Sequence, residues 1–310
     1  MKMESSNDFP AVAVFIFNRP ELASKLLEIL RRVRPSKLYV ISDGSRIARS
    51  DDLIKVQKSR EVFKSIDWEC NVQFHYSDRN LGSKWRIISG IEWVLSQEEM
   101  AIFLEDDCLP DESFFIFCNE LLKRYKLDLN VGMISGNNFI SDSMISKNSY
   151  TFSNFYNCWG WATWSNRWFN HFDPEIKSWP KFSKSEDFYL IAKNFFVRLY
   201  WRNIYTKIYK GEMQSAWDYQ WMLANWSAKR VSIVPSSNLV SNVGFGEDAT
   251  HTTEITDMIN LPSNRMKFPL IHPKEIHADN TFDCGVLERL HGATIRRKIK
   301  LLILYLLGTI

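Results

Sequence analysis

The first part of the chain alternates between continuous apolar runs and stretches with apolar residues at helical spacing. Residues 11–17, AVAVFIF, form the unbroken apolar run that a strand covered on both faces requires. Residues 21–35 place leucines three and four positions apart and end at a proline, which predicts a helix. A second strand follows at KLYVISDGS, residues 37–45. Strand, helix and strand in this order favour a βαβ unit with a parallel sheet.

The alternation continues beyond this unit. The further predicted elements are, in order, a helix at 51–66, a strand at 71–77, a helix at 85–96, a strand at 101–107, a helix from about 110 to 125, a strand at 131–139 and a helix at 185–209. The pattern predicts the α/β class, with a parallel sheet flanked by helices.

Polar residues follow four of the predicted strands. Asn18, Asp43, Asp78 and the acidic triplet at 105–107 each come directly after an apolar run. In open α/β sheets, ligands bind where the carboxyl ends of the strands meet the loops. We therefore expect these side chains to form one binding edge.

The acidic triplet is the most informative of these features. Glu105, Asp106 and Asp107 end a buried strand, where neighbouring carboxylates raise one another's pKa and lose hydration. A divalent cation such as Mg²⁺ or Mn²⁺, held by one or two carboxylates and a substrate's phosphates, would neutralise them. The alternative is that Asp106 or Asp107 caps the helix that starts near Pro110.

Composition narrows the class of protein. The chain has 310 residues, of which 45% are hydrophobic and 24% charged, enough for a large core. Its net charge of only +3 gives no sign of a nucleic-acid partner. Five scattered cysteines without CxxC spacing favour a reducing compartment. The acidic start MKMESSNDFP is unlike a signal peptide, so we expect a cytoplasmic protein.

The segment FLEDDCLPDESFFIFCNELLKRY, residues 103–125, resembles the metal-binding segment of glycosyltransferases with the GT-A fold. It is most similar to the inverting N-acetylglucosaminyltransferase I family and its bacterial family-2-like relatives, whose acidic DXD motif reads Glu-Asp-Asp. The motifs FNRP, ISDGS, NLG and WDYQW follow in the same order across roughly residues 10–250. The resemblance implies a nucleotide-sugar donor with UDP as the leading nucleotide, bound Mn²⁺ or Mg²⁺, and transfer with inversion.

Site residues are carried over from this resemblance position by position. Asp107 matches the acid that binds the metal, Asp106 the acid near the donor ribose, and Glu105 the acid near the donor sugar. Asp43 matches the residue that hydrogen-bonds the edge of the nucleobase, although it could equally be an ordinary turn residue.

Two further positions follow the first strand. Asn18 and Arg19 lie where the family holds the base and the phosphate.

Inverting transfer also needs a carboxylate that takes the proton of the acceptor hydroxyl. Asp218, in SAWDYQWMLANW, lies in a stretch that resembles the family's Trp-Asp-Asp-Trp-Met segment and is the expected base. This chain departs from the family in having Tyr219 and Gln220 after a single Asp. The alternative is that Asp218 caps a helix that begins there.

Two more segments have candidate residues. In CWGWAT, Gly160 and Trp161 resemble the Gly-Trp pairs that border the donor in GT-A enzymes, with core packing as the alternative. The loop-like NVGFGEDATHT, residues 242–252, is a candidate to close over the donor. Its His251 would contact the metal or the diphosphate, or would simply be solvated.

The C-terminal residues 294–310 place four basic residues before an apolar run of about ten residues, too short to cross a bilayer, which takes roughly 20. An amphipathic helix lying on an anionic membrane surface is predicted. The alternative is packing on the protein's own core or on another subunit. A membrane contact would place the protein at the inner face of the cell membrane and favour a lipid-linked acceptor.

Together with the resemblance, these features predict one GT-A domain over residues 1–270. Its Rossmann-like sheet would be mixed and mostly parallel and flanked by helices. Its first half, about 10–110, would bind the nucleotide sugar and its second half, 111–270, a saccharide or lipid-linked acceptor. An extension over 271–310 would carry the basic amphipathic helix. The expected function is a metal-dependent glycosyltransferase of bacterial surface-polysaccharide assembly.

Two other functions compete with it. A sugar-phosphate nucleotidyltransferase would normally carry a Gly-rich N-terminal loop, which FIFNRPELAS lacks. A non-catalytic glycan-binding module on a transferase fold is the other.

Overall fold

The computed structural model describes residues 9–140, 147–244, 261–291 and 295–309. The strands in this part of the chain are β1 (Ala11–Ile16), β2 (Lys37–Ser42), β3 (Asn71–Tyr76), β4 (Met100–Glu105), β5 (Cys108–Pro110), β6 (Val131–Ser135), β7 (Tyr150–Ser153), β8 (Trp161–Trp164), β9 (Val231–Pro235) and β10 (Val240–Asn242).

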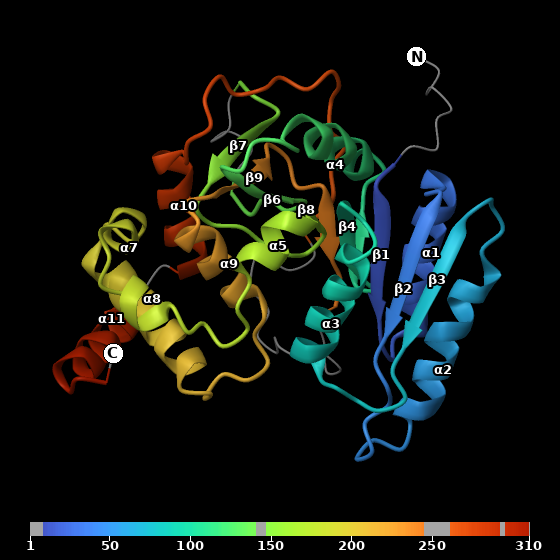
Figure 1. Cartoon of the computed structure of the whole chain (residues 1–310), viewed down its shortest axis with the longest axis horizontal. Helices are drawn as coiled ribbons and strands as arrows, with labels where there is room; N and C mark the ends of the chain where they lie inside the picture. Colours follow the sequence, from blue (N-terminus) through green and yellow to red (C-terminus); the bar gives the residue numbers. More distant parts are fainter. Residues whose placement is uncertain (1–8, 141–146, 245–260, 292–294, 310) are drawn as a thin grey trace.

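Helices cover both faces of the sheet that these strands form (Figure 1). The helices are α1 (Pro20–Val33), α2 (Asp52–Val62), α3 (Ser83–Leu95), α4 (Ser113–Arg124), α5 (Ser165–His171), α6 (Trp179–Phe182), α7 (Glu186–Ile191), α8 (Phe195–Tyr209), α9 (Asp218–Ser227), α10 (Asn280–His291) and α11 (Ile295–Leu306), and a 3-10 turn (Phe63–Ser65) follows α2.

Within the described residues, eight strands form one sheet in the order β3-β2-β1-β4-β8-β6-β9-β7. Strands β3, β2, β1 and β4 are parallel, whereas β8 runs antiparallel to both β4 and β6. Strand β9 is parallel to β6 and antiparallel to β7. The sheet is therefore mixed and mostly parallel, in agreement with the expected fold class.

The unbroken apolar sequence of β1 follows from its place between two cores. Ala11, Ala13 and Phe15 face the core that α3 and α5 to α9 complete. Val12, Val14 and Ile16 alternate with them and face the core beneath α1 and α4. Because every side chain of β1 is buried, each position must be apolar.

Local hydrogen bonds shorten two of the predicted elements. The helix predicted at 185–209 divides into α7 and α8, because the Asn194 side chain accepts a bond of 2.8 Å from the amide of Phe196 and starts a new helix. The strand predicted at 131–139 ends at Ser135, and the side chain of Asn137 then donates 2.9 Å to the carbonyl of Val240.

Strands β5 and β10 form a small antiparallel pair beside the main sheet. This pair joins the chain just after the acidic triplet to the chain near residue 240, with Cys108 opposite Asn242. A segment more than a hundred residues away is thereby fixed next to the end of β4.

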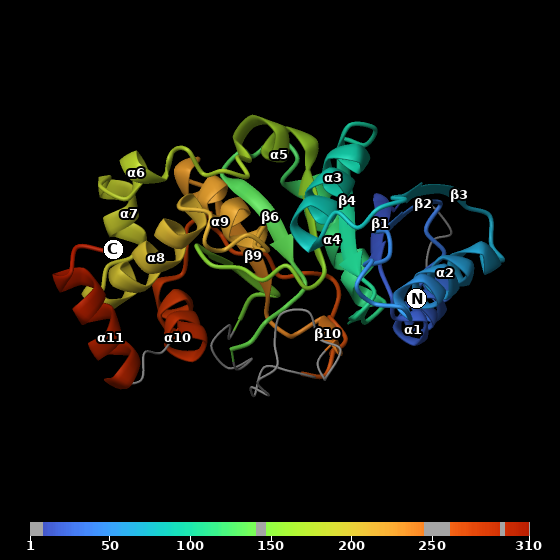
Figure 2. The ribbon, with the colours of Figure 1, turned by 90° about the horizontal axis from the view of Figure 1, so that it is seen from below.

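The C-terminal helices belong to the body of the molecule (Figures 1 and 2). On α10, Phe282 is buried, and the Asp283 carboxylate accepts bonds from the Ser153 hydroxyl and the Asn154 side-chain amide. Helix α11 packs against α8 and buries Leu301. The boundary predicted at residue 270 therefore does not mark a break in packing.

The contacts of Asp283 predict a clear loss of stability when they are removed. In Asp283→Ala, the buried donors of Ser153 and Asn154 lose their acceptor, so the free energy of unfolding should fall by roughly 2–4 kcal/mol. Chemical denaturation measures this change. The matched control is Glu288→Ala, an exposed position on the same helix, which should stay within about 0.5 kcal/mol of the parent. Equal loss in both variants would contradict the role of Asp283.

Candidate functional site

A cavity of about 690 Å³ opens at the carboxyl ends of β1, β2 and β4. Its other walls come from the loop before α3, the segment before β8, the start of α9 and the end of β10. The size is typical of a small-molecule site. Parallel strands that end at one edge, with loops above them, place a ligand at this position.

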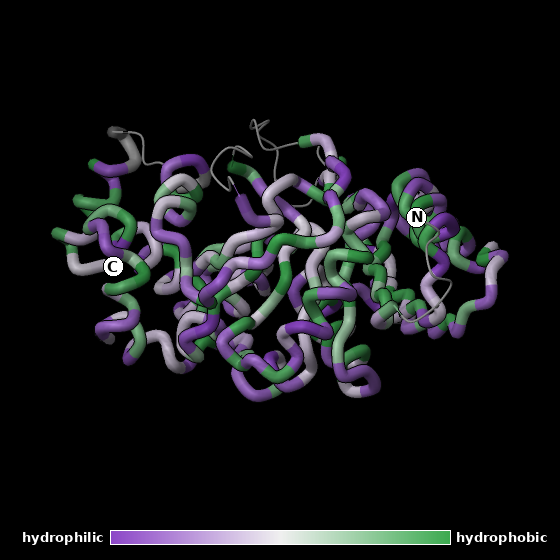
Figure 3. Tube along the Cα trace, turned by 90° about the horizontal axis from the view of Figure 1, so that it is seen from above, coloured by the Kyte–Doolittle hydropathy of each residue, from purple (hydrophilic) through white to green (hydrophobic). Residues whose placement is uncertain are grey.

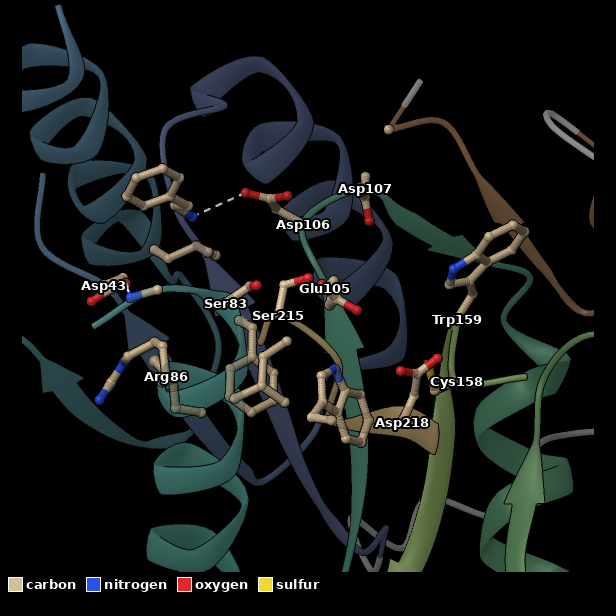
Figure 4. Close-up of a pocket in the computed structure, with 18 of the residues that line it drawn as sticks. Asp43, Ser83, Arg86, Glu105, Asp106, Asp107, Cys158, Trp159, Ser215 and Asp218 are labelled. Atoms are coloured by element: carbon tan, nitrogen blue, oxygen red, sulfur yellow. Dashed lines mark hydrogen bonds between the residues drawn. The ribbon is translucent and has the colours of Figure 1, made fainter. Parts of the chain in front are cut away.

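The structure brings most of the predicted site residues together at this cavity (Figure 4). The residues concerned are Asn18, Arg19, Asp43, Glu105, Asp106, Asp107 and Asp218. They come from four elements separated by up to 200 positions in the sequence. Residues at the ends of β1, β2 and β4 therefore line one cavity, and their binding role stays a prediction. After β3, Asn80 and Gly82 line the cavity in the place expected for Asp78.

The three acids of the triplet have different partners. Asp106 accepts a bond of 3.1 Å from the Phe17 amide of the neighbouring chain segment. Asp107 forms an ion pair of 2.8 Å with Arg19 Nη1. The start of α4 is capped by Asp111, whose Oδ1 accepts 2.8 Å from the amide of Ser113. The alternative that Asp106 or Asp107 caps this helix is therefore wrong.

Bringing the three carboxyl groups of the triplet together is electrostatically unfavourable. Burial, and next the charge of Asp107, raise the pKa of both Glu105 and Asp106 well above the usual range of carboxyl groups. The Arg19 guanidinium opposes this rise only in part. The end of β4 is therefore a place where further positive charge would be strongly stabilising.

The chain after β10 covers one side of Asp107. The amide of Val243 donates 2.9 Å to the Asp107 carbonyl. A Cβ at Gly244 would lie 1.8 Å from Asp107 Oδ2, so this close approach requires glycine. The next residues, 245–260, include His251, which lies outside the described part of the chain.

The carboxylates at the cavity suit a metal ion that takes part of its ligands from a bound substrate. Across the described residues, no group of three or more His, Cys, Asp or Glu side chains is arranged to hold a metal. Mg²⁺ and Mn²⁺, however, are often bound through one or two carboxylates and the oxygens of a substrate's phosphates. Asp107, at the cavity, fits an ion of that kind, and Glu105 and Asp106 line the same cavity beside it.

Asp43 has a structural role that extends beyond its own turn to a loop far along the chain. Its carboxylate accepts bonds of 2.9–3.1 Å from the amides of Gly44, Leu81 and Gly82 and from the Asn80 side chain. Burial raises its pKa, and the three amides oppose that rise. Asp43 thus fixes the wall formed by residues 80–82, which agrees better with a loop-forming role than with direct contact to a base.

Asn18 belongs to a network that the sequence did not reveal. Its side-chain amide donates 2.7 Å to Asp52, which also accepts bonds from Arg46. Asp52 is buried, and the bond from Arg46 lowers its pKa to about 2. Because Asp52 starts a polar helix, it looks like an ordinary surface acid in the sequence. Here it holds Arg46 at the cavity wall, over the ring of Phe17.

Asp218 is the first residue of α9 and lines the wall nearest to Trp159 (Figure 4). The Tyr156 hydroxyl donates 2.8 Å to the carbonyl of Asp218, and the Tyr205 hydroxyl donates 3.1 Å to that of Tyr219. Both tyrosines are buried. These bonds fix the backbone that carries the Asp218 carboxylate, and a helix N-terminus favours negative charge.

The structure corrects the prediction for Gly160 and Trp161. Trp161 is 3% exposed, with its ring 4.8 Å from that of Phe103 and 5.7 Å from that of Trp217. Gly160 has a φ of +75°, and a Cβ there would meet Val240. Gly160 and Trp161 therefore pack in the core, as the alternative interpretation of this segment predicts.

The aromatic residue that reaches the cavity lies two positions earlier. Trp159 lines the cavity together with Cys158, whereas β8 begins at Trp161 and directs that ring into the core. Trp217 also contributes to the lining. The sequence located the aromatic segment but not the side chain that faces the site.

Replacing one acid of the triplet should stabilise the folded protein when no ligand is bound. The folded-state pKa of Glu105 is raised. Its contribution to the free energy of unfolding is therefore fully present below about pH 4 and is lost as pH rises through the folded-state pKa. Glu105→Gln should therefore raise the free energy of unfolding at neutral pH by roughly 1–3 kcal/mol, with the difference vanishing at low pH.

Thermal unfolding across pH, without metal or nucleotide, measures this effect. Glu69→Gln, at an exposed position, is the matched control and should follow the parent curve. A Glu105→Gln variant that is less stable than the parent at neutral pH would refute the electrostatic argument.

Comparisons with known proteins give little guidance. No protein-family model matches the sequence, and no curated protein matches it. Among solved structures, HddC from Yersinia pseudotuberculosis resembles part of the chain with 10% sequence identity and a TM-score of 0.31. The similarity covers 50% of this chain and 77% of HddC. At that TM-score it carries no inference about fold or function.

Proposed function

We propose that the protein is a GT-A-type, metal-dependent, inverting glycosyltransferase. It would transfer a sugar from a nucleoside-diphosphate donor, with UDP-sugars as the leading class, to a saccharide or lipid-linked acceptor. One observation carries the proposal: a single cavity holds the acidic triplet at the end of β4 and, on another wall, Asp218, whose backbone carbonyl accepts a bond from the Tyr156 hydroxyl.

The donor would lie at the ends of β1, β2 and β4. Three arginines, Arg19, Arg46 and Arg86, line this side and provide positive charge for a diphosphate. Asp107 would hold Mn²⁺ or Mg²⁺, and the ion would stabilise the charge that develops on the leaving diphosphate. The Arg19–Asp107 ion pair already joins the two groups that would bind phosphate and metal.

The acceptor would enter from the side of α9. There Asp218 would accept the proton of the attacking hydroxyl as its oxygen bonds to the anomeric carbon, and the nucleoside diphosphate would leave from the opposite face of the sugar. Trp159, Trp217 and Tyr219 line the same wall and offer apolar surface to a sugar ring. The bonds from Tyr156 and Tyr205 hold the base in one position, as efficient proton transfer requires.

A nucleotidyltransferase is less well supported. Only residues 17–19 connect β1 to α1, which leaves little chain to surround a triphosphate. A binding module without turnover would need no base, and the following experiments separate it from an enzyme.

Nucleotide binding should depend on the metal and on Asp107. Isothermal titration of UDP should show roughly 10- to 100-fold weaker binding without Mn²⁺ than with it. Asp107→Asn should remove most of this difference, because it removes the charge that holds the ion. Asp67→Asn, an exposed acid on the far side of α1, is the control and should keep the metal dependence. Equal affinity with and without Mn²⁺ in the parent would refute the metal site.

Asp218→Asn should reduce transfer by about 10²–10⁴-fold and leave UDP affinity nearly unchanged, because a base acts on the acceptor only during transfer. A screen of nucleotide sugars with Mn²⁺ first identifies a donor that is hydrolysed or transferred. The matched control is Asp187→Asn, which removes an acid from the first turn of α7 outside the cavity. Transfer by Asp218→Asn within a few-fold of the parent would exclude this base.

A further inference from the structure

Helix α11 has its apolar surface on the outside. Leu301 is 3% exposed and faces the body of the protein, where α11 packs against α8. The other side carries five exposed apolar residues, which we call the outer stripe: Ile299, Leu302, Ile303, Leu306 and Leu307, exposed by 54%, 38%, 51%, 74% and 70%. A terminal helix that served only to close the core would place these residues inward.

The outer stripe has helical spacing. Its members lie at positions i, i+3, i+4, i+7 and i+8, which places them along one side of the helix. Lys298 and Lys300 are both exposed and, at 100° per residue, fall on either side of the stripe. The helix thus combines an apolar strip with basic borders.

Neighbouring contacts fix the orientation of the helix. The ring of Tyr305 lies edge-on to Phe195 of α8, with centroids 5.7 Å apart. The Lys298 ammonium lies 5.5 Å from the centre of the Phe196 ring. Because these contacts and Leu301 attach one side of α11 to α8, the stripe cannot turn inward without breaking them.

The stripe lies at the end of the molecule far from β1 to β3. Figures 1 and 2 show α11 beside α8 at this end, and Figure 3 shows hydrophobic stretches of the chain near the end marked C. Phe195, itself 39% exposed, continues the apolar surface from α11 onto α8. Helices α8 and α11 therefore form this surface without the loops around the cavity.

We propose that the outer stripe of α11 lies in the plane of an anionic lipid surface. In this arrangement the apolar residues enter the acyl boundary and the lysines contact the phosphates of the headgroups. The sequence adds Arg296 and Arg297 to the same helix. No helix in the described part of the chain is long and apolar enough to span a bilayer, so contact in the plane is the geometry that suits this helix.

Charge distinguishes this partner from a second copy of the protein. Two copies that met through their outer stripes in parallel would bring the like charges of Lys298 and Lys300 together, and an antiparallel pair would offer these lysines no acidic partner, because α11 contains no Asp or Glu. An anionic bilayer offers the opposite charge over the whole length of the helix. The proposal stands independently of the proposed function, because it concerns a surface away from the cavity.

The test is cosedimentation of the full chain with vesicles of phosphatidylglycerol and phosphatidylcholine, compared with phosphatidylcholine alone. We expect binding to the anionic vesicles that weakens with added salt. Ile303→Glu with Leu306→Glu should reduce binding by roughly tenfold or more, because it places charge in the apolar stripe. Both positions are exposed, so circular dichroism should show a folded protein.

Matched variants control for hydrophobicity and charge. Leu127→Glu changes a leucine that is 90% exposed and lies after α4, and it should bind like the parent. Lys300→Glu should weaken binding by about fivefold or more, whereas Lys58→Glu on α2, with the same change in net charge, should not.

Three outcomes would overturn the proposal: no binding of the parent to anionic vesicles, undiminished binding of the stripe variant, or a parent dimer that the stripe variant converts to a monomer. Light scattering decides the last. UDP titration and sugar transfer should be unaffected by the stripe variant, so loss of vesicle binding and failure of the proposed enzyme function are separately visible.

Discussion

The concentration of negative charge at the end of β4 is the constraint on which the rest of the site depends. Strand pairing places Phe15 of β1 opposite Glu105 of β4, so the chain that follows β1 runs directly beside the acids. The Phe17 amide and the Arg19 guanidinium then offset part of the charge of Asp106 and Asp107. Burial still raises the pKa of Glu105 and Asp106, so the folded protein retains an unfavourable interaction that a bound cation would relieve.

Strand pairing, buried hydrogen bonds and aromatic packing hold the segments around the acidic triplet in place. The β5–β10 pair fixes the chain near residue 240 against Asp107, and two buried tyrosines hold the start of α9. Beneath the cavity, Trp161 packs among aromatic rings that include Trp168 and Trp221. Most of the tryptophans therefore belong to the two apolar cores, and Trp159 and Trp217 line the cavity. Close packing of this kind limits the movement of the segments that carry the charged side chains.

The cavity and the outer stripe of α11 differ in which groups face inward and which face outward. At the cavity, charged side chains lie inside the molecule because the carboxyl ends of strands and the first residues of helices meet there. On α11, apolar groups face outward because Leu301 and Tyr305 already occupy the side that meets α8. Both arrangements cost stability in the isolated chain, and costs of this kind are typical of surfaces that bind a partner. They are also far enough apart to be altered one at a time.

The sequence by itself determined the α/β class, the order of the main-sheet strands and α-helices as far as α4, and the acids at the end of β4. These features depend on local periodicity and on burial of both faces of a strand, which are written in consecutive residues. Tertiary structure decided the rest. It turned Trp159 and not Trp161 to the cavity, engaged Asp43 with the loop at 80–82, and joined Asp52 to Asn18 and Arg46. These outcomes depend on which distant segments pack together, and no pattern of neighbouring residues encodes the direction of a single side chain within such a contact.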